Sequence, residues 1–182
     1  FRKWIITVSI ILLLIILKGA SVTWNCKNQN SIEGAKNEIL QRRDYLLQKL
    51  TVSPGTVLDE MPSEKIIGEQ FRGEWALYSC SMLSAALVNI SLLYPDTKED
   101  NLKSIDKLIQ IVKSPILRYY DADRWAEDPL ESLHSDNSHV SYLSHLAWMI
   151  CGYKQTGGGN QYDELLSSLC STMNRRIIRV SL

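Results

Sequence analysis

The sequence predicts an all-α protein built from antiparallel helix pairs. Apolar residues recur at the three- and four-residue spacings of a helix in several segments, and Pro and Gly separate those segments. The sequence contains no clear alternation of apolar and polar residues and no Asn-Gly turn, so no strand is predicted. With 45% hydrophobic residues in 182, the chain can bury a core, which excludes wholesale disorder.

The first segment, residues 1–22, is predicted to be a signal-anchor or a signal peptide. Arg2 and Lys3 precede an apolar run over 4–17, which as a helix covers about 21 Å of a roughly 30 Å hydrocarbon core. Snorkelling by Lys18 would complete a short span, whereas a cleaved signal peptide is the alternative. Positive charge before the run predicts a membrane-anchored protein whose domain lies on the extracytoplasmic side, periplasmic or extracellular.

The second segment, residues 23–68, is predicted to hold a helix and a linker. Apolar residues at helical spacing predict an amphipathic helix near 31–50. Residues 51–68 are predicted to form a connecting loop because Pro and Gly punctuate them at Pro54, Gly55, Pro62 and Gly68.

The third segment, residues 69–182, is predicted to be one helical domain. The pattern of its first part favours a long, largely buried helix over 69–93, which Tyr94-Pro95 would end. The row that predicts this buried face is Phe71, Trp75, Tyr78, Met82, Ala85, Ala86, Asn89, Leu92 and Leu93.

Three further helices are predicted in this domain. One spans 100–112 and stops at Pro115, and one spans about 139–153 after capping residues at 135–138. The last follows Asn160 and carries an apolar face. Because the sequence stops without a clear terminal signal, we expect the domain to be truncated.

An acidic segment over 121–139 is the most unusual part of the composition. The chain balances 20 basic against 20 acidic residues, and this neutrality argues against a nucleic-acid partner. The segment nevertheless gathers six acids and one Arg. Because binding groups concentrate on loops, Asp128 and Glu131 are candidate substrate-binding residues. The alternative is a solvated connector whose carboxylates start a helix.

No metal and no cofactor are predicted. His134, His139 and His145 fit no compact zinc spacing, and the chain has no Cys-x-x-Cys. The acidic segment also does not match the spacing of an EF-hand loop.

The predicted helix at 139–153 carries a second set of candidates. Tyr142, His145 and Met149 are spaced to share one face, and Trp148 adjoins it. A histidine among such residues suits an acid/base group in an aromatic-walled substrate pocket. A core histidine hydrogen-bonded to a neighbouring helix fits the same pattern, and both interpretations stay open.

Three segments in this order resemble the linalool dehydratase/isomerase family. They are Tyr78-Ser79 in the long helix that ends near Tyr94-Pro95-Asp96, the stretch Glu127-Asp128-Pro129-Leu130-Glu131, and the His145-Leu146 helix with Tyr142 before it, Met149 and Tyr153 after it, and Tyr162 beyond a glycine turn. The resemblance covers roughly residues 70–178. It implies an (α/α)6 toroid around a mostly apolar cavity, of which this chain would hold the N-terminal half.

The resemblance also implies roles for two residues. Tyr78 matches a tyrosine that lines the cavity, and His145 matches the histidine near the substrate hydroxyl, where it would polarise the oxygen or relay a proton. The implied function is a lyase, a hydro-lyase or isomerase acting on a small alcohol. The family also relies on two cysteines and a tyrosine in its second half, which this chain lacks.

Two alternatives to this function stay open. One is a carbohydrate-active enzyme on the same architecture, a glycan hydrolase, lyase or epimerase, with carboxylates of the acidic segment as acid and base. The other is a non-catalytic binding domain. The partner is accordingly predicted to be a small-molecule or glycan substrate, besides the membrane at the N-terminal helix.

Overall fold

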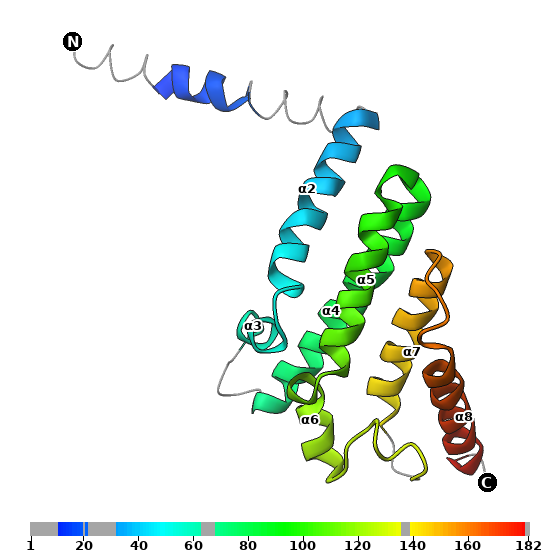
Figure 1. Cartoon of the computed structure of the whole chain (residues 1–182). Helices are drawn as coiled ribbons and strands as arrows, with labels where there is room; N and C mark the ends of the chain where they lie inside the picture. The colour runs from blue at the N-terminus through cyan, green and yellow to red at the C-terminus, as the bar shows by residue number, and fades with distance from the viewer. Residues whose placement is uncertain (1–10, 20, 22–31, 63–67, 136–138, 181–182) are drawn as a thin grey trace. The chain divides into compact units, whose positions relative to one another are not determined.

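The computed structural model describes residues 11–19, 21, 32–62, 68–135 and 139–180 (Figure 1). Over these residues it contains helices and no strand, which confirms the all-α prediction. The named elements are α2 (Ile32–Leu50), α3 (Pro54–Asp59), α4 (Gly68–Leu93), the 3-10 helix η1 (Pro95–Thr97), α5 (Lys98–Lys113), α6 (Pro115–Trp125), α7 (Val140–Gln155) and α8 (Asp163–Val180).

The chain divides into two compact units, Phe1–Tyr45 and Leu46–Leu182, and the division falls within α2. In the first unit, residues 11–19 form a helix whose apolar side chains Ile11–Leu17 are 53–65% exposed. The rest of the predicted signal or anchor lies outside the described residues, apart from Ser21. Membrane anchoring therefore stays a prediction.

The second unit is organised around α4. This helix packs against α5, α6 and α7, and α8 packs against α7 (Figure 1). Short connections join α4 to α5 and α7 to α8, which makes each pair neighbours in the bundle. The largest fully buried side chains come from all five helices and include Leu77, Ile105, Leu117, Leu146 and Leu169.

Length and composition would let α4 cross a membrane. Its stretch Phe71–Leu93 is the one such candidate in the described part of the chain, and 56% of the apolar window is buried inside the protein. Because α4 contacts three other helices of the core, its hydropathy is accounted for by packing.

Two helices lie where none was predicted. One, α3, lies within the predicted loop, and the other, α6, begins at Pro115, which was predicted only to end a helix. Within 51–68, Ser53 caps α3 by accepting a hydrogen bond from the Thr56 amide, and Pro54 follows at the first helical position. Ser114 and Pro115 repeat this arrangement at the start of α6. The prediction of Pro115 as a stop was therefore incomplete, because a proline that ends one helix also suits the first turn of the next.

The face of α4 that the pattern predicts as buried is largely exposed. Phe71, Trp75 and Met82 are 47%, 51% and 57% exposed, while Leu77 and Ser84 face the core. The prediction was wrong because the sequence from 75 to 93 contains no charged residue, so the pattern does not distinguish one face from the other.

Candidate functional site

Tyr78 on α4 and His145 on α7 lie against each other. Their ring centroids are 4.7 Å apart, and the rings are tilted by 43°. Both side chains are partly exposed, and the packing of α4 against α7 holds them together. The two residues that the family resemblance selects are thus neighbours in the structure.

Ser81, three residues after Tyr78 on α4, lies against the ring of His145. Its hydroxyl oxygen is 3.0 Å from the Tyr78 carbonyl oxygen and 2.8 Å from Nδ1 of His145. Because a hydroxyl has one proton, Ser81 donates to only one of these two atoms. When that proton goes to the carbonyl oxygen, Nδ1 carries a proton and Nε2 is the basic nitrogen of the neutral ring.

Two groups hold the Tyr78 hydroxyl. It donates to the Glu74 carboxylate at 2.8 Å and lies 3.2 Å from the Ser141 hydroxyl, which therefore donates to it. The Ser141 hydrogen bond lowers the pKa of Tyr78, but the hydrogen bond to Glu74, burial and the Glu74 charge together outweigh it. The pKa of Tyr78 is therefore raised, and the phenol keeps its proton at neutral pH.

The pKa of His145 is shifted in the opposite direction. Burial lowers its pKa below the ordinary value, and the negative charge of Glu74 offsets only part of that effect. His145 is therefore neutral at pH 7, next to a protonated phenol. At pH 7 the pair therefore offers a group that can give a proton and a group that can accept one.

Two tryptophans flank this pair. The Trp75 ring lies edge-on to Tyr78 at 6.3 Å, and the Trp148 ring lies 6.2 Å from His145. Trp75 and Trp148 are 51% and 46% exposed, so two exposed rings lie on either side of the pair. Beside it, between α4 and α7, is a pocket of about 170 Å³ that Trp148 and the predicted site residue Met149 help to line.

Tyr142 does not join this cluster. Its side chain is fully buried, and its hydroxyl donates to the Val112 carbonyl oxygen of α5 at 3.0 Å. Burial also raises its pKa, so the phenol stays protonated. The structure thus places the predicted substrate-binding residue Tyr142 in the core, where it fixes α7 against α5.

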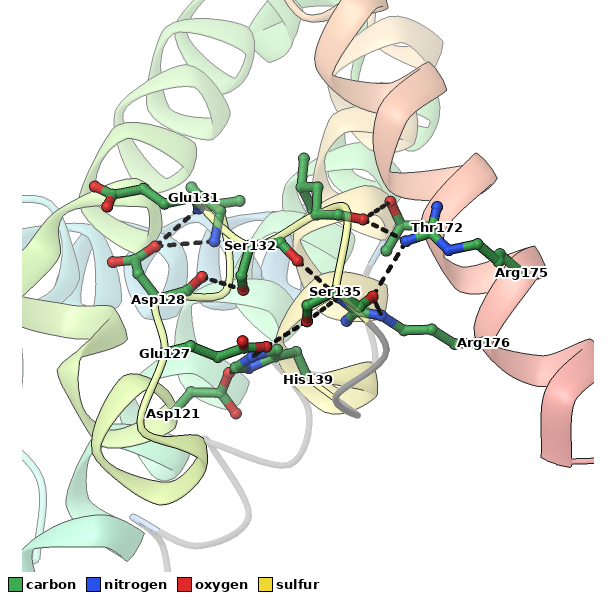
Figure 2. A network of polar contacts seen from close by, with 12 residues as sticks. Asp121, Glu127, Asp128, Glu131, Ser132, Ser135, His139, Thr172, Arg175 and Arg176 are labelled. Carbon is green, nitrogen blue, oxygen red and sulfur yellow. Dashed lines mark hydrogen bonds and ion pairs between the residues drawn. The ribbon is translucent and has the colours of Figure 1, made fainter.

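The carboxylate of Asp128 forms hydrogen bonds within its own segment (Figure 2) and an ion pair with Arg118 of α6. It pairs with Arg118 at 2.6 Å and accepts hydrogen bonds from the Leu130 and Glu131 amides at 2.9 and 3.2 Å. The Glu131 carboxylate lies 3.6 Å from Arg118 and is otherwise exposed. These contacts hold a turn together and do not bring Asp128 or Glu131 to the Tyr78–His145 pair.

Figure 2 also shows a buried histidine that pattern reasoning did not select. His139 has no solvent exposure of its side chain, and its ring contacts Asp121 through Nδ1 and Glu127 through Nε2 at 3.1 Å. Burial raises the pKa of Asp121, and the hydrogen bond to His139 opposes that rise. His139 has a φ of 35°, so the backbone is in the left-handed region where α7 begins.

Two arginines of α8 complete this network. Arg176, 4% exposed, donates to the carbonyl oxygens of Ser132 and Ser135 at 3.0 and 3.1 Å. Arg175 donates to the carbonyl oxygens of Leu133 and Ser135. The acidic segment is therefore a brace between α6, α7 and α8. Its density of carboxylates gives no sequence signal for this role, because the partners on α8 are about forty residues away.

No group of three or more His, Cys, Asp or Glu side chains is placed to hold a metal ion in the residues that the structure describes. The absence of a metal and a cofactor stays a prediction.

Comparison of the chain with protein-family models, with curated proteins and with solved structures gave no match.

Proposed function

We propose that the protein is a membrane-anchored, extracytoplasmic enzyme of the linalool dehydratase/isomerase type, a hydro-lyase or isomerase that acts on a small alcohol. The observation that carries this proposal is the Tyr78–His145 pair, a protonated phenol and a neutral imidazole whose ring centroids are 4.7 Å apart and which two exposed tryptophans flank. The resemblance over roughly residues 70–178 adds the reaction class and a toroid of helix pairs.

The proposed reaction removes water from the alcohol. Tyr78 turns from Glu74 and gives its proton to the substrate oxygen as the C–O bond breaks, which releases water. Nε2 of His145 takes a proton from the neighbouring carbon, and its C–H electron pair forms the new double bond. Return of that proton from the imidazolium to the phenolate restores both residues, and hydration is the same sequence in reverse.

The apolar surroundings assist this chemistry. Trp75 and Trp148 offer ring faces to a hydrocarbon chain, while a hydrogen bond from Nδ1 of the histidine to Ser81 would leave Nε2 basic. By contrast, no described contact favours the carbohydrate-active alternative, because Asp128 is held by Arg118.

Turnover of an allylic alcohol tests the proposal. The full chain is incubated with a small tertiary allylic alcohol, and the alkene is measured by gas chromatography. Tyr78→Phe and His145→Gln should each lower turnover by about 100-fold or more, whereas Tyr119→Phe, at an exposed tyrosine on α6, should leave it unchanged. Equal turnover by His145→Gln and the unaltered chain would overturn the proposal.

The membrane anchor has its own test. Exposed apolar side chains over Ile11–Leu17 support insertion of the N-terminal helix. We expect the full chain to remain in the membrane fraction after alkaline carbonate extraction, and a chain that starts at residue 23 to be released. Release of the full chain would contradict anchoring and would leave the proposed chemistry standing.

A further inference from the structure

The pocket between α4 and α7 contains a buried hydroxyl without a hydrogen-bond partner. Ser84 is 1% exposed and lines the pocket. Across the described part of the chain, Ser84 Oγ and Tyr120 Oη are the buried side-chain oxygens that have no partner. Leaving a buried hydroxyl unbonded is unfavourable, so a molecule in the adjoining pocket that can hydrogen-bond to Ser84 would be stabilised there.

The other lining residues define what can occupy the pocket. Ala85, Val88, Met149 and Trp148 provide apolar contacts, and none of the ten lining residues is charged. Ser81, Asn89 and Gln155 add uncharged polar side chains to that of Ser84. An ionic ligand would lose its hydration without gaining a counter-charge. The volume of about 170 Å³ is close to that of an apolar protein cavity of roughly 150 Å³ that accepts benzene.

Gly152 keeps this space open next to Ser84. A β-carbon at position 152 would lie 3.8 Å from Ser84 Oγ and 3.0 Å from a methyl group of Val88. The absence of a side chain therefore leaves room at the hydroxyl.

We propose that this pocket binds a small, uncharged, mainly apolar molecule with one hydroxyl or carbonyl oxygen, which hydrogen-bonds to Ser84 Oγ. Ser81 and Trp148 line the pocket and also contact His145, so the bound molecule lies next to the acid/base pair. The link to turnover rests on the proposed function and deepens it, because it defines the substrate class. Binding itself does not depend on that function.

The test is a binding titration of the full chain with benzyl alcohol, toluene and benzoate, followed by NMR. We expect benzyl alcohol and toluene to show saturable binding, with the higher affinity for benzyl alcohol. Benzoate should not reach saturation. Ser84→Ala should weaken the binding of benzyl alcohol about three- to tenfold, which corresponds to the loss of one neutral hydrogen bond. The affinity for toluene should not change. Ser79→Ala, a partly buried serine of α4 that does not line the pocket, is the matched control and should change neither.

A second variant and a folding control complete the experiment. Gly152→Ala should weaken both benzyl alcohol and toluene, because its methyl group takes up space in the pocket. A thermal melt of each variant checks folding, and Ser84→Ala should melt at or above the unaltered temperature, since its hydroxyl has no partner to lose. Retained preference for benzyl alcohol over toluene in Ser84→Ala would overturn the proposal, and so would the lack of saturable binding by the unaltered chain.

The pocket and the proposed reaction fail separately. Saturable, Ser84-dependent binding together with no turnover would overturn the proposed function and support the pocket. Turnover that requires His145 but does not respond to Ser84→Ala or Gly152→Ala would support the function and overturn the pocket as its substrate site.

Discussion

Ser81 Oγ on α4 lies 2.8 Å from Nδ1 of His145 on α7 and 3.0 Å from the Tyr78 carbonyl oxygen. If the single proton of Ser81 goes to the carbonyl oxygen, Nδ1 of His145 carries a proton and one tautomer of the ring is favoured. The first prediction follows from this relationship. In Ser81→Ala, both neutral tautomers of His145 should become populated, which nitrogen NMR chemical shifts of the ring will report. Ser79→Ala is the control, and an unchanged single tautomer in Ser81→Ala would contradict the assignment.

The second prediction concerns the pH dependence of stability. Because burial lowers the pKa of His145 in the folded state, the unfolded chain takes up a proton first as the pH falls below about 6.5. The contribution of His145 to the free energy of unfolding is therefore fully present above that pH, and it is lost as the pH falls. Denaturant unfolding at pH 7.5 and 5.5 should show a smaller loss for His145→Gln than for the unaltered chain.

Exposed His134 supplies the control for that comparison. His134→Gln is the matched substitution, because it removes an imidazole from an exposed position. An identical loss in His145→Gln and His134→Gln would show that His145 does not contribute.

The third prediction tests the approach of α6 to α4. A β-carbon on Gly73 would lie 2.5 Å from Cδ1 and 2.6 Å from Cβ of Tyr120, and rotation of the Tyr120 side chain cannot move its Cβ away. Gly73→Ala should therefore destabilise the protein by about 1–3 kcal/mol, despite the better helix propensity of alanine. Gly55→Ala in α3 meets nothing within 4 Å and should be neutral or stabilising. Urea unfolding measures both.

The fourth prediction uses the end of α6. Ala126 follows this helix with a φ of 56°, in the left-handed region that favours glycine. Ala126→Gly should raise the free energy of unfolding by about 0.5–1 kcal/mol, the reverse of the loss that glycine causes inside a helix. A lower melting temperature for Ala126→Gly would contradict the assigned backbone geometry.

The fifth prediction concerns the brace formed by α8. Arg176→Met should leave the carbonyl oxygens of Ser132 and Ser135 without these hydrogen bonds and destabilise the protein by about 1–3 kcal/mol. Lys103→Met, at an exposed ion pair with Glu99 on α5, should change stability by less than about 1 kcal/mol. Similar effects of the two substitutions on denaturant unfolding would argue against the brace.

The one-sided helices were predictable from sequence. In α5 the apolar residues Ile105, Leu108, Ile109 and Val112 are all buried, because charged residues occupy the opposite face and only one orientation hides them. The buried face of α4 was not predictable in the same way. Its stretch from 75 to 93 is uncharged all round, so the partner helices decide which side faces the core.

The candidate site was predictable only in part. Tyr78 and His145 were selected by resemblance, and Glu74 and Ser81 lie within one helical turn of Tyr78, so helical spacing alone could have added them. The pairing of α4 with α7 is a tertiary contact without a sequence signal of its own. For the same reason the ion pair of Asp128 with Arg118 and the contacts of His139 could not be read from the acidic segment.

The uncharged sequence of α4 has a consequence for export. If residues 1–22 direct the chain through a translocon, α4 arrives there unfolded, before any neighbour can cover it. An apolar segment of this length then competes for lateral release into the bilayer. The hydroxyls of Ser79, Ser81, Ser84 and Ser91 and the amide of Asn89 lower that tendency, so the polar groups along α4 would also favour passage of the domain across the membrane.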